Sequence, residues 1–235
     1  MEERNEKYFN FPVQLLENFL INTNEVLNNI SQYSVYFYGH SYLSYTEGLD
    51  MFNESADFFN ITFGDKDIAY KRGEMLYDSM PLNSPMVGLN LSIFWDFIKN
   101  EKTEFEKITL LGFLAIKSIL QKKSYCKITN KFWLSRMDGK AKAVSDTSNL
   151  SDSILKYAVH YQLRKIKAEL ERSWNLKTVS GRGFNVSFTM SFDALTYEVL
   201  KRRKKYKDFE ILKVKNEAKE KALLRIYGTQ PKDNL

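Results

Sequence analysis

The sequence contains very few of the side chains on which metal and redox sites depend. Among its 235 residues, Cys126 is the one cysteine, and His40 and His160 are the two histidines. A single thiol cannot form an internal disulfide, which favours a reducing compartment. One thiol and two imidazoles also cannot supply the ligands of an ordinary zinc site. The sequence therefore predicts no metal site and no cofactor.

Other familiar signals are missing as well. There is no GxxxxGK[ST] loop, no GxGxxG turn and no visible pairing of a nucleophile with a base, so we expect a protein that is not an enzyme. No apolar run approaches the ~20 residues of a membrane span. The amino terminus, MEERNEKYFNF, is charged and lacks the apolar segment of a signal peptide. We expect a cytoplasmic protein, and the abundance of Lys, Asn, Ile, Tyr and Phe is typical of A-T-rich bacterial or phage genomes.

The charge is unevenly distributed along a chain that is 43% hydrophobic and should be globular. Up to Ile98 there are five basic and fourteen acidic residues, and from Lys99 onward there are thirty basic and fifteen acidic ones. The front therefore carries a charge of −9 and the back +15. A basic part attracts polyanions, while the acidic part is expected to contact a protein partner or a second copy of the chain.

Hydrophobic periodicity predicts mainly helices in the front of the chain. A short helix opens at Phe11-Pro12, and a second runs from Thr23 or Asn24 to Gly39. Two more are predicted over Thr46 to Phe59 and Asp65 to Met80, and Asn90 or Ser92 caps the next. A polar stretch at Glu101 to Glu106 separates this part from the basic part.

The basic part begins with a strongly apolar helix over Ile108 to Leu120. A brief strand near Cys126, a helix capped by Thr129 and ended by Asp138-Gly139, and a loop over Lys140 to Asn149 follow. Two C-terminal helices are predicted, one from Ser191 or Asp193 into Lys201 to Lys205, and one from Phe209 to Tyr227.

The most informative stretch runs from Ser151 to Met190. Over residues 152–173 the spacing predicts one helix with Leu155, Val159, Ile166 and Leu170 on its apolar side. Lys156, His160, Arg164 and Lys167 follow the same steps on the opposite, cationic side. Alternation from Phe184 to Met190 then predicts a strand, which pairs with Leu176 to Val179 through a turn with Gly181 at its positive-φ position.

The order helix, short strand, helix, helix, strand, turn, strand over Ile108 to Met190 resembles the winged helix-turn-helix superfamily. The helical front and the Phe11-Pro12 opening loosely resemble replication initiators of plasmids and other mobile elements. The first resemblance implies that the helix at 152–173 enters a DNA major groove and that the hairpin at 176–190 is a wing. The loop before that helix is longer and richer in Lys than in the simplest members. The fold class predicted is mainly α with a small β-hairpin, divided into an acidic helical domain (1–100), a winged helix domain (101–191) and basic C-terminal helices (192–235).

These features predict non-enzymatic binding of nucleic acid, most simply duplex DNA, with RNA as an alternative, in replication or transcription regulation. Arg164 and Lys165 are expected to reach base edges, and Arg182 to enter a minor groove. Lysines around the helix are suited to phosphates. The predicted binding residues are Lys140, Lys142, Lys156, Tyr157, His160, Tyr161, Arg164, Lys165, Lys167, Arg182, Lys201, Arg202, Arg203, Lys204 and Lys205.

Two alternatives belong to other classes. In the first, the protein is a structural or adaptor subunit of a larger nucleoprotein complex, with mainly protein or RNA contacts. In the second, Asp50, Glu54 and Asp57, which share one predicted helical face, hold Mg²⁺ for a nuclease reaction. An acidic set of this kind is more often a solvated helix face.

Overall fold

The computed structural model describes residues 6–43, 45, 47–181 and 183–228. As predicted, the fold is mainly helical with little β-structure, which forms two small antiparallel sheets, one of two strands and one of three. The helices are α1 (Thr23–Tyr42), α2 (Gly48–Phe59), α3 (Lys66–Ser79), α4 (Leu91–Lys99), α5 (Glu104–Leu120), α6 (Asn130–Met137), α7 (Asp152–Leu155), α8 (His160–Ser173) and α9 (Phe192–Tyr227), with single 3-10 turns η1 (Val13–Leu16) and η2 (Thr147–Asn149). The strands are β1 (Tyr8–Pro12), β2 (Met86–Asn90), β3 (Cys126–Ile128), β4 (Lys177–Gly181) and β5 (Gly183–Ser187).

The chain begins with a strand, where the sequence predicted a helix at Phe11-Pro12. In β1, Phe9 and Phe11 are fully buried, while Tyr8 and Asn10 are exposed. This alternation of period two is that of a half-buried strand. Pairing with β2 places Phe9 opposite Leu89. The backbone groups of β1 are thus hydrogen-bonded to a strand that lies about eighty residues later in the chain. The helix prediction was wrong because the partner strand is so distant in sequence.

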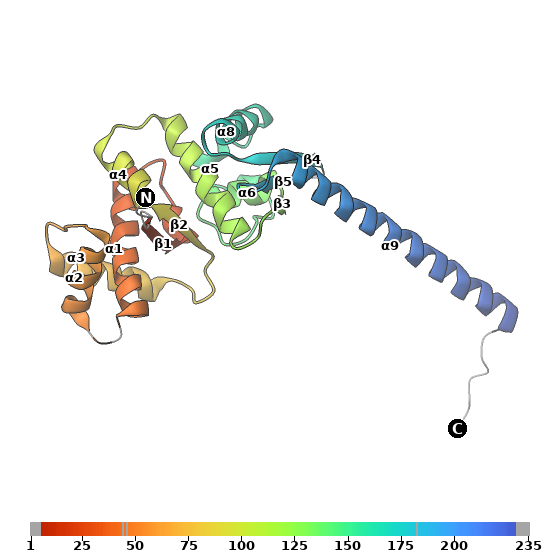
Figure 1. Cartoon of the computed structure of the whole chain (residues 1–235), viewed down its shortest axis with the longest axis horizontal. Coiled ribbons are helices and arrows are strands. Elements are labelled where there is room, and N and C mark those ends of the chain that lie inside the picture. Colours follow the sequence, from red (N-terminus) through yellow and green to blue (C-terminus); the bar gives the residue numbers. More distant parts are fainter. Residues whose placement is uncertain (1–5, 44, 46, 182, 229–235) are drawn as a thin grey trace, which may run out of the picture.

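The N-terminal helices pack around α1, which contacts both α2 and α3 (Figure 1). The contact between α1 and α3 is close at Gly73. A Cβ atom added at Gly73 would lie 2.7 Å from the backbone oxygen of Gln32 and 3.0 Å from Cβ of Tyr36. The missing side chain therefore sets how near the two helices can approach.

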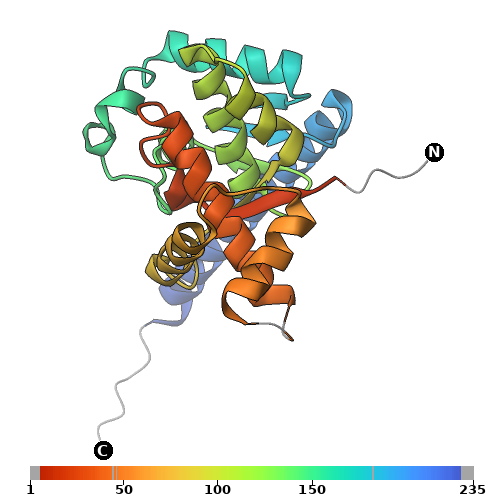
Figure 2. The ribbon, with the colours of Figure 1, turned by 90° about the vertical axis from the view of Figure 1, so that its left-hand side faces the viewer.

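Helix α5 joins the front of the molecule to the back. It begins with a capping box, in which Thr103 and Glu106 exchange hydrogen bonds, at the polar stretch that the sequence placed between the two parts. Its side chains Ile108, Leu111 and Leu114 are buried. The helix contacts β2 and η1 on one side and α6 and α8 on the other, and Figures 1 and 2 show it between the two groups of elements.

The elements from α5 to β5 follow the predicted order of helix, strand, helix, helix, strand, strand. The three-stranded sheet has the order β3-β5-β4, and Ser180 pairs with Phe184 across the hairpin. The turn differs from the prediction because Gly183, with φ of 83°, has the positive φ angle that was expected at Gly181. A Cβ atom at Gly183 would lie 2.5 Å from the backbone oxygen of Ile128 on β3, so only glycine fits there.

The helix predicted over 152–173 is broken in two. Helix α7 ends at Leu155, and α8 begins at His160 after Val159, whose backbone is extended (ψ of 145°). The break lets Ile154 and Tyr157 turn inward together. The break also turns Leu155, at the end of α7, and Val159, just before α8, to the surface, although both were predicted on the buried side. A single continuous cationic face along 152–173 was therefore a wrong prediction.

The two predicted C-terminal helices are one continuous helix. Helix α9 spans 36 residues, because nothing between Lys204 and Phe209 breaks a helix. Leu195 and Val199 pack into the protein, and every described side chain from Leu200 to Leu224 is exposed. Figure 1 shows α9 leaving the rest of the protein as a straight helix. Within the described residues, each helix is too short or too polar to cross a bilayer.

Replacing Gly73 with alanine should destabilise the protein. Alanine gains about 1 kcal/mol over glycine inside a helix. The added methyl group must push against the backbone of α1, and overpacking of this kind costs about 1–3 kcal/mol. Urea unfolding of Gly73→Ala should therefore show a lower free energy of unfolding than wild type.

The matched control is Gly64→Ala, since a Cβ atom there meets nothing within 4 Å. Its unfolding midpoint should stay close to that of wild type. Equal or greater stability of Gly73→Ala would contradict the close packing of α1 on α3.

Candidate nucleic-acid interface

Helix α8 presents the predicted base-reading residues on its outer side. Leu163, Ile166 and Leu170 are buried at steps of three and four, and they hold the helix against α5. The side chains of the opposite half of the helix are therefore directed to solvent. Exposed on this outer side are His160, Tyr161, Arg164, Lys165 and Ala168, followed in the last turn by Glu171 and Arg172.

Arg164 and Lys165 lie at the centre of this exposed side. The amine of Lys165 lies 4.7 Å from the centroid of the Phe105 ring at the start of α5, so its stem lies along the neighbouring helix. Tyr161 is 69% exposed one turn earlier, and His160 begins the helix. The structure brings together four of the predicted residues as one cationic and aromatic surface.

Two predicted residues in the break before α8 lie elsewhere. The amine of Lys156 forms an ion pair with the carboxylate of Glu104, the first residue of α5. Tyr157, predicted on the surface, is only 8% exposed. Burial, and then hydrogen bonding to Glu104, raises the pKa of its hydroxyl. Both side chains therefore fasten the break to α5 in this structure.

Lys167 faces the sheet and not the solvent. Its amine donates a hydrogen bond of 3.0 Å to Oδ1 of Asn130 and lies 3.5 Å from the centroid of the Phe184 ring. Burial lowers the pKa of this amine to about 8, against a smaller opposite effect of the Glu171 carboxylate. Lys167, which was predicted to contact phosphate, thus forms a cation–π contact between α8 and β5.

The loop after α6 is closed by one of its own lysines. The amine of Lys140 pairs with the buried carboxylate of Asp138 and also donates to the backbone oxygen of Asn149. Asp138 in turn accepts hydrogen bonds from the amide and hydroxyl of Ser151. Lys142, in contrast, is exposed. Arg182, predicted at the tip of the hairpin, lies outside the described residues.

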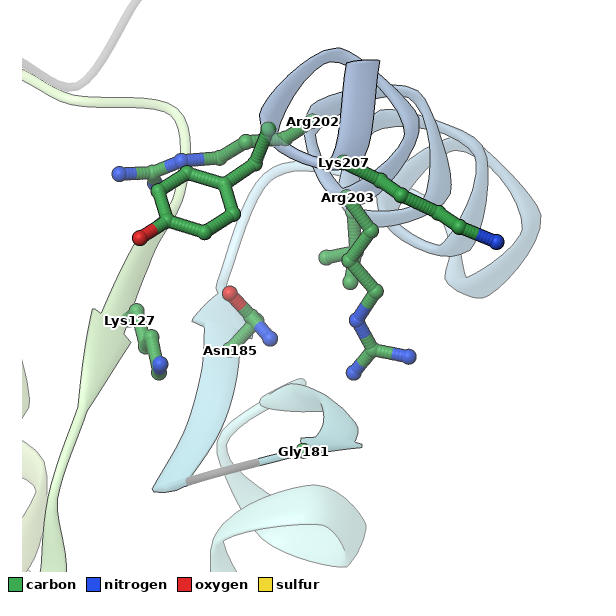
Figure 3. Close-up of a pocket in the computed structure, with 8 residues that line it drawn as sticks. Lys127, Gly181, Asn185, Arg202, Arg203 and Lys207 are labelled. Atoms are coloured by element: carbon green, nitrogen blue, oxygen red, sulfur yellow. The ribbon is translucent and has the colours of Figure 1, made fainter. Parts of the chain in front are cut away.

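The basic run of α9 is divided between two sides of the helix. Arg202 and Arg203 share a side with Leu195 and Val199 and face the sheet, whereas Lys201, Lys204 and Lys205 do not line that side. Between this side and the sheet is a cleft of about 700 Å³ (Figure 3). It is lined by Lys127, Gly181, Asn185, Val199, Arg202, Arg203, Tyr206 and Lys207.

Lys127 and Lys207 were missed by the sequence prediction. In the predicted brief strand, Lys127 alternates with Cys126 and the buried Ile128, which indicates that it lies on the outer face of the sheet. Lys207 follows Arg203 by four residues and so lies one turn further along the same side of α9. Neither pattern indicated that α9 would pack across this sheet, because that packing depends on tertiary contacts and not on local sequence.

The acidic residues of α2 do not form a candidate metal site. Among the residues that the structure describes, no three His, Cys, Asp or Glu side chains are grouped so that they could hold a metal ion. This covers Asp50, Glu54 and Asp57. The hydroxyl of Tyr45 donates a hydrogen bond of 2.6 Å to Glu54. The nuclease alternative therefore gains no support from the placement of these carboxylates.

Comparison with protein-family models, with curated proteins and with solved structures yields no match. What the surface binds must therefore be inferred from its own geometry and charge.

The lowered pKa of Lys167 should be visible in solution. Between pH 8 and the ordinary lysine value of 10.5, the unfolded chain holds a proton that folded Lys167 has lost. The free energy of unfolding should therefore rise with pH in this window, because the cost of burying the charged amine is fully present below pH 8 and is lost as the amine deprotonates. Titration of the lysine Cε signals by ¹³C NMR should show one amine near 8, and Lys167→Met should remove it.

Denaturation provides a second measurement. The stability difference between wild type and Lys167→Met should shift in favour of wild type as the pH rises from about 8 to about 10. Lys142→Met, which removes an exposed amine, should still show the one lysine amine with a lowered pKa. If Lys167→Met still shows an amine with this lowered pKa, the assignment to Lys167 is wrong and another lysine is responsible.

Proposed function

We propose that the protein binds duplex DNA through the outer side of α8, in the manner of a winged helix-turn-helix protein. The observation that supports this most directly is the exposed set of Tyr161, Arg164 and Lys165 on a helix held from behind by α5. An α-helix fits the major groove of B-DNA, and these side chains are on the side that would enter it. The order of elements from α5 to β5 also resembles the helix, strand, helix, helix, strand, strand order on which the likeness to this superfamily rests.

The roles of the residues follow from their chemistry. Arg164 has a planar guanidinium that can donate two hydrogen bonds to a guanine edge. Lys165 was expected at base edges, but its amine lies over the Phe105 ring beside α5, so Lys165, like His160, is better suited to phosphates, which add affinity without sequence information. Tyr161 offers a hydroxyl and an exposed ring at the first turn of α8. Arg182 would extend the footprint toward a minor groove.

The acidic front would be repelled by DNA, which orients the protein on the duplex. In this proposal, α1 to α4 contact a protein partner or a second copy of the chain. Such a protein would act in the bacterial cytoplasm, in replication or transcription of the element that encodes it.

An adaptor role in a larger nucleoprotein complex is the second candidate. The supporting observation is α9, which exposes large apolar side chains, including Phe209, Leu212 and Val214, beyond the part of the helix that faces the sheet. Apolar side chains in such a position favour contact with another protein. In that case, affinity for duplex DNA should not depend on Arg164 and Lys165.

Selection of bound fragments from random duplex DNA would test the proposal. Wild type should enrich a motif that contains a guanine, and Arg164→Ala should relax the preference at that position at a cost of about 1–3 kcal/mol. Lys165→Ala should weaken binding uniformly and lower the slope of log Kd against log salt by about 0.9.

The matched control is Lys66→Ala with Lys71→Ala, which removes two exposed positive charges from α3 instead. That variant should keep both the motif and the salt slope. If the α8 variants bind duplex DNA as wild type does, the proposal fails and the adaptor role is favoured.

A further inference from the structure

We propose that the cleft between α9 and the three-stranded sheet binds a single-stranded polynucleotide. This would be a second ligand, separate from the duplex proposed for α8, and the proposal does not depend on α8. It rests on the charge of the cleft, on the way one arginine is held in it, and on the aromatic and amide groups among its lining.

The cleft concentrates positive charge without compensation. Lys127 comes from β3, and Arg202, Arg203 and Lys207 come from α9. No carboxylate lines the cleft, and among the described residues none of these four cations lies within ion-pair distance of an Asp or Glu. Like charges in a recess repel one another, and a bound polyanion relieves that repulsion. The recess therefore favours a phosphate backbone.

Arg203 is held in position before any ligand arrives. Its Nη2 atom donates a hydrogen bond of 2.7 Å to the backbone oxygen of Ser180 on β4. The guanidinium passes directly over Gly181, where a Cβ atom would lie 2.6 Å from Nη2. Figure 3 shows the side chain reaching from α9 toward Gly181. A guanidinium fixed in this way loses less entropy when it binds a phosphate.

Two further groups favour a single strand over a duplex. Tyr206 lines the cleft with a ring that is 64% exposed, and stacking on such a ring requires a free base. Asn185 is only 5% exposed, and Figure 3 shows it between Lys127 and Arg203. A group must enter the cleft to reach this amide. A duplex keeps its bases in its own stack, whereas a single strand can turn a base toward Tyr206 and Asn185.

The test uses the full chain and a fluorescent oligothymidylate of about ten nucleotides, with an oligouridylate of the same length to compare DNA with RNA. Anisotropy should show salt-dependent binding to wild type. Lys127→Gln with Arg202→Gln should lower the slope of log Kd against log salt by about 1.4, or about 0.7 for each lost phosphate contact. Tyr206→Ala should weaken binding about tenfold, and Tyr206→Phe should not.

The matched control is Lys204→Gln with Lys205→Gln, which removes the same charge from the same stretch of α9 but from residues that do not line the cleft. An equal loss in this control would overturn the cleft as a site and leave only general attraction. If inorganic phosphate displaces the oligonucleotide at the same concentration of phosphate groups, the cleft binds phosphate alone and a single strand is not its ligand. Arg164→Ala with Lys165→Ala should leave oligothymidylate binding unchanged, so that failure of the duplex proposal and failure of this one give different results.

Discussion

Burial of α5 is the constraint on which the rest of the structure depends. Its apolar side chains require cover on nearly every side, and they obtain it from β2 and η1 in the front of the chain and from α6 and α8 in the back. At Gly112, the absence of a side chain lets α6 and α8 approach closely, since a Cβ atom there would lie 3.1 Å from Trp133 and 3.2 Å from Ile166. The indole of Trp133 donates a hydrogen bond of 3.0 Å to the Gly112 oxygen. This junction fixes the side of α8 that remains in solvent.

Elements with strong local signals could be predicted from the sequence. The apolar helix α5, the brief strand β3 and the helix capped by Thr129 are specified by side chains within a few residues of each other. Strand β1 could not be predicted, because its partner β2 lies about eighty residues away and no local pattern reports the pairing. The break before α8 was missed for a related reason. Val159 fits a helical period, and the cover that α5 gives to Tyr157 decides the backbone there.

The candidate interface was predicted in part for the same physical reasons. Arg164 and Lys165 are exposed as expected, because their positions relative to Leu163 and Ile166 are set within α8 itself. Lys167 was expected on the surface but follows the buried Leu163 by four residues, which places it beside the buried side of α8. Tyr157 was also expected on the surface and faces inward because of the break before α8. The cleft could not be predicted at all. It forms from β3, β4, β5 and α9, of which β3 lies about fifty residues before β4, and a helical basic run does not indicate which of its members will face a sheet. The division of the chain into three domains stays a prediction.

The attachment of α9 has a mechanical consequence. Its buried side chains, Leu195 and Val199, lie in its first two turns, and a hydrogen bond from Arg203 to the backbone of Ser180 holds it to the hairpin one turn further on. From Val199 to Tyr227 the helix extends about 42 Å, so a tilt of about ten degrees at its base displaces the far end by about 7 Å. The cleft lies at the attached end of α9, so a small change of angle there corresponds to a large displacement of the far end.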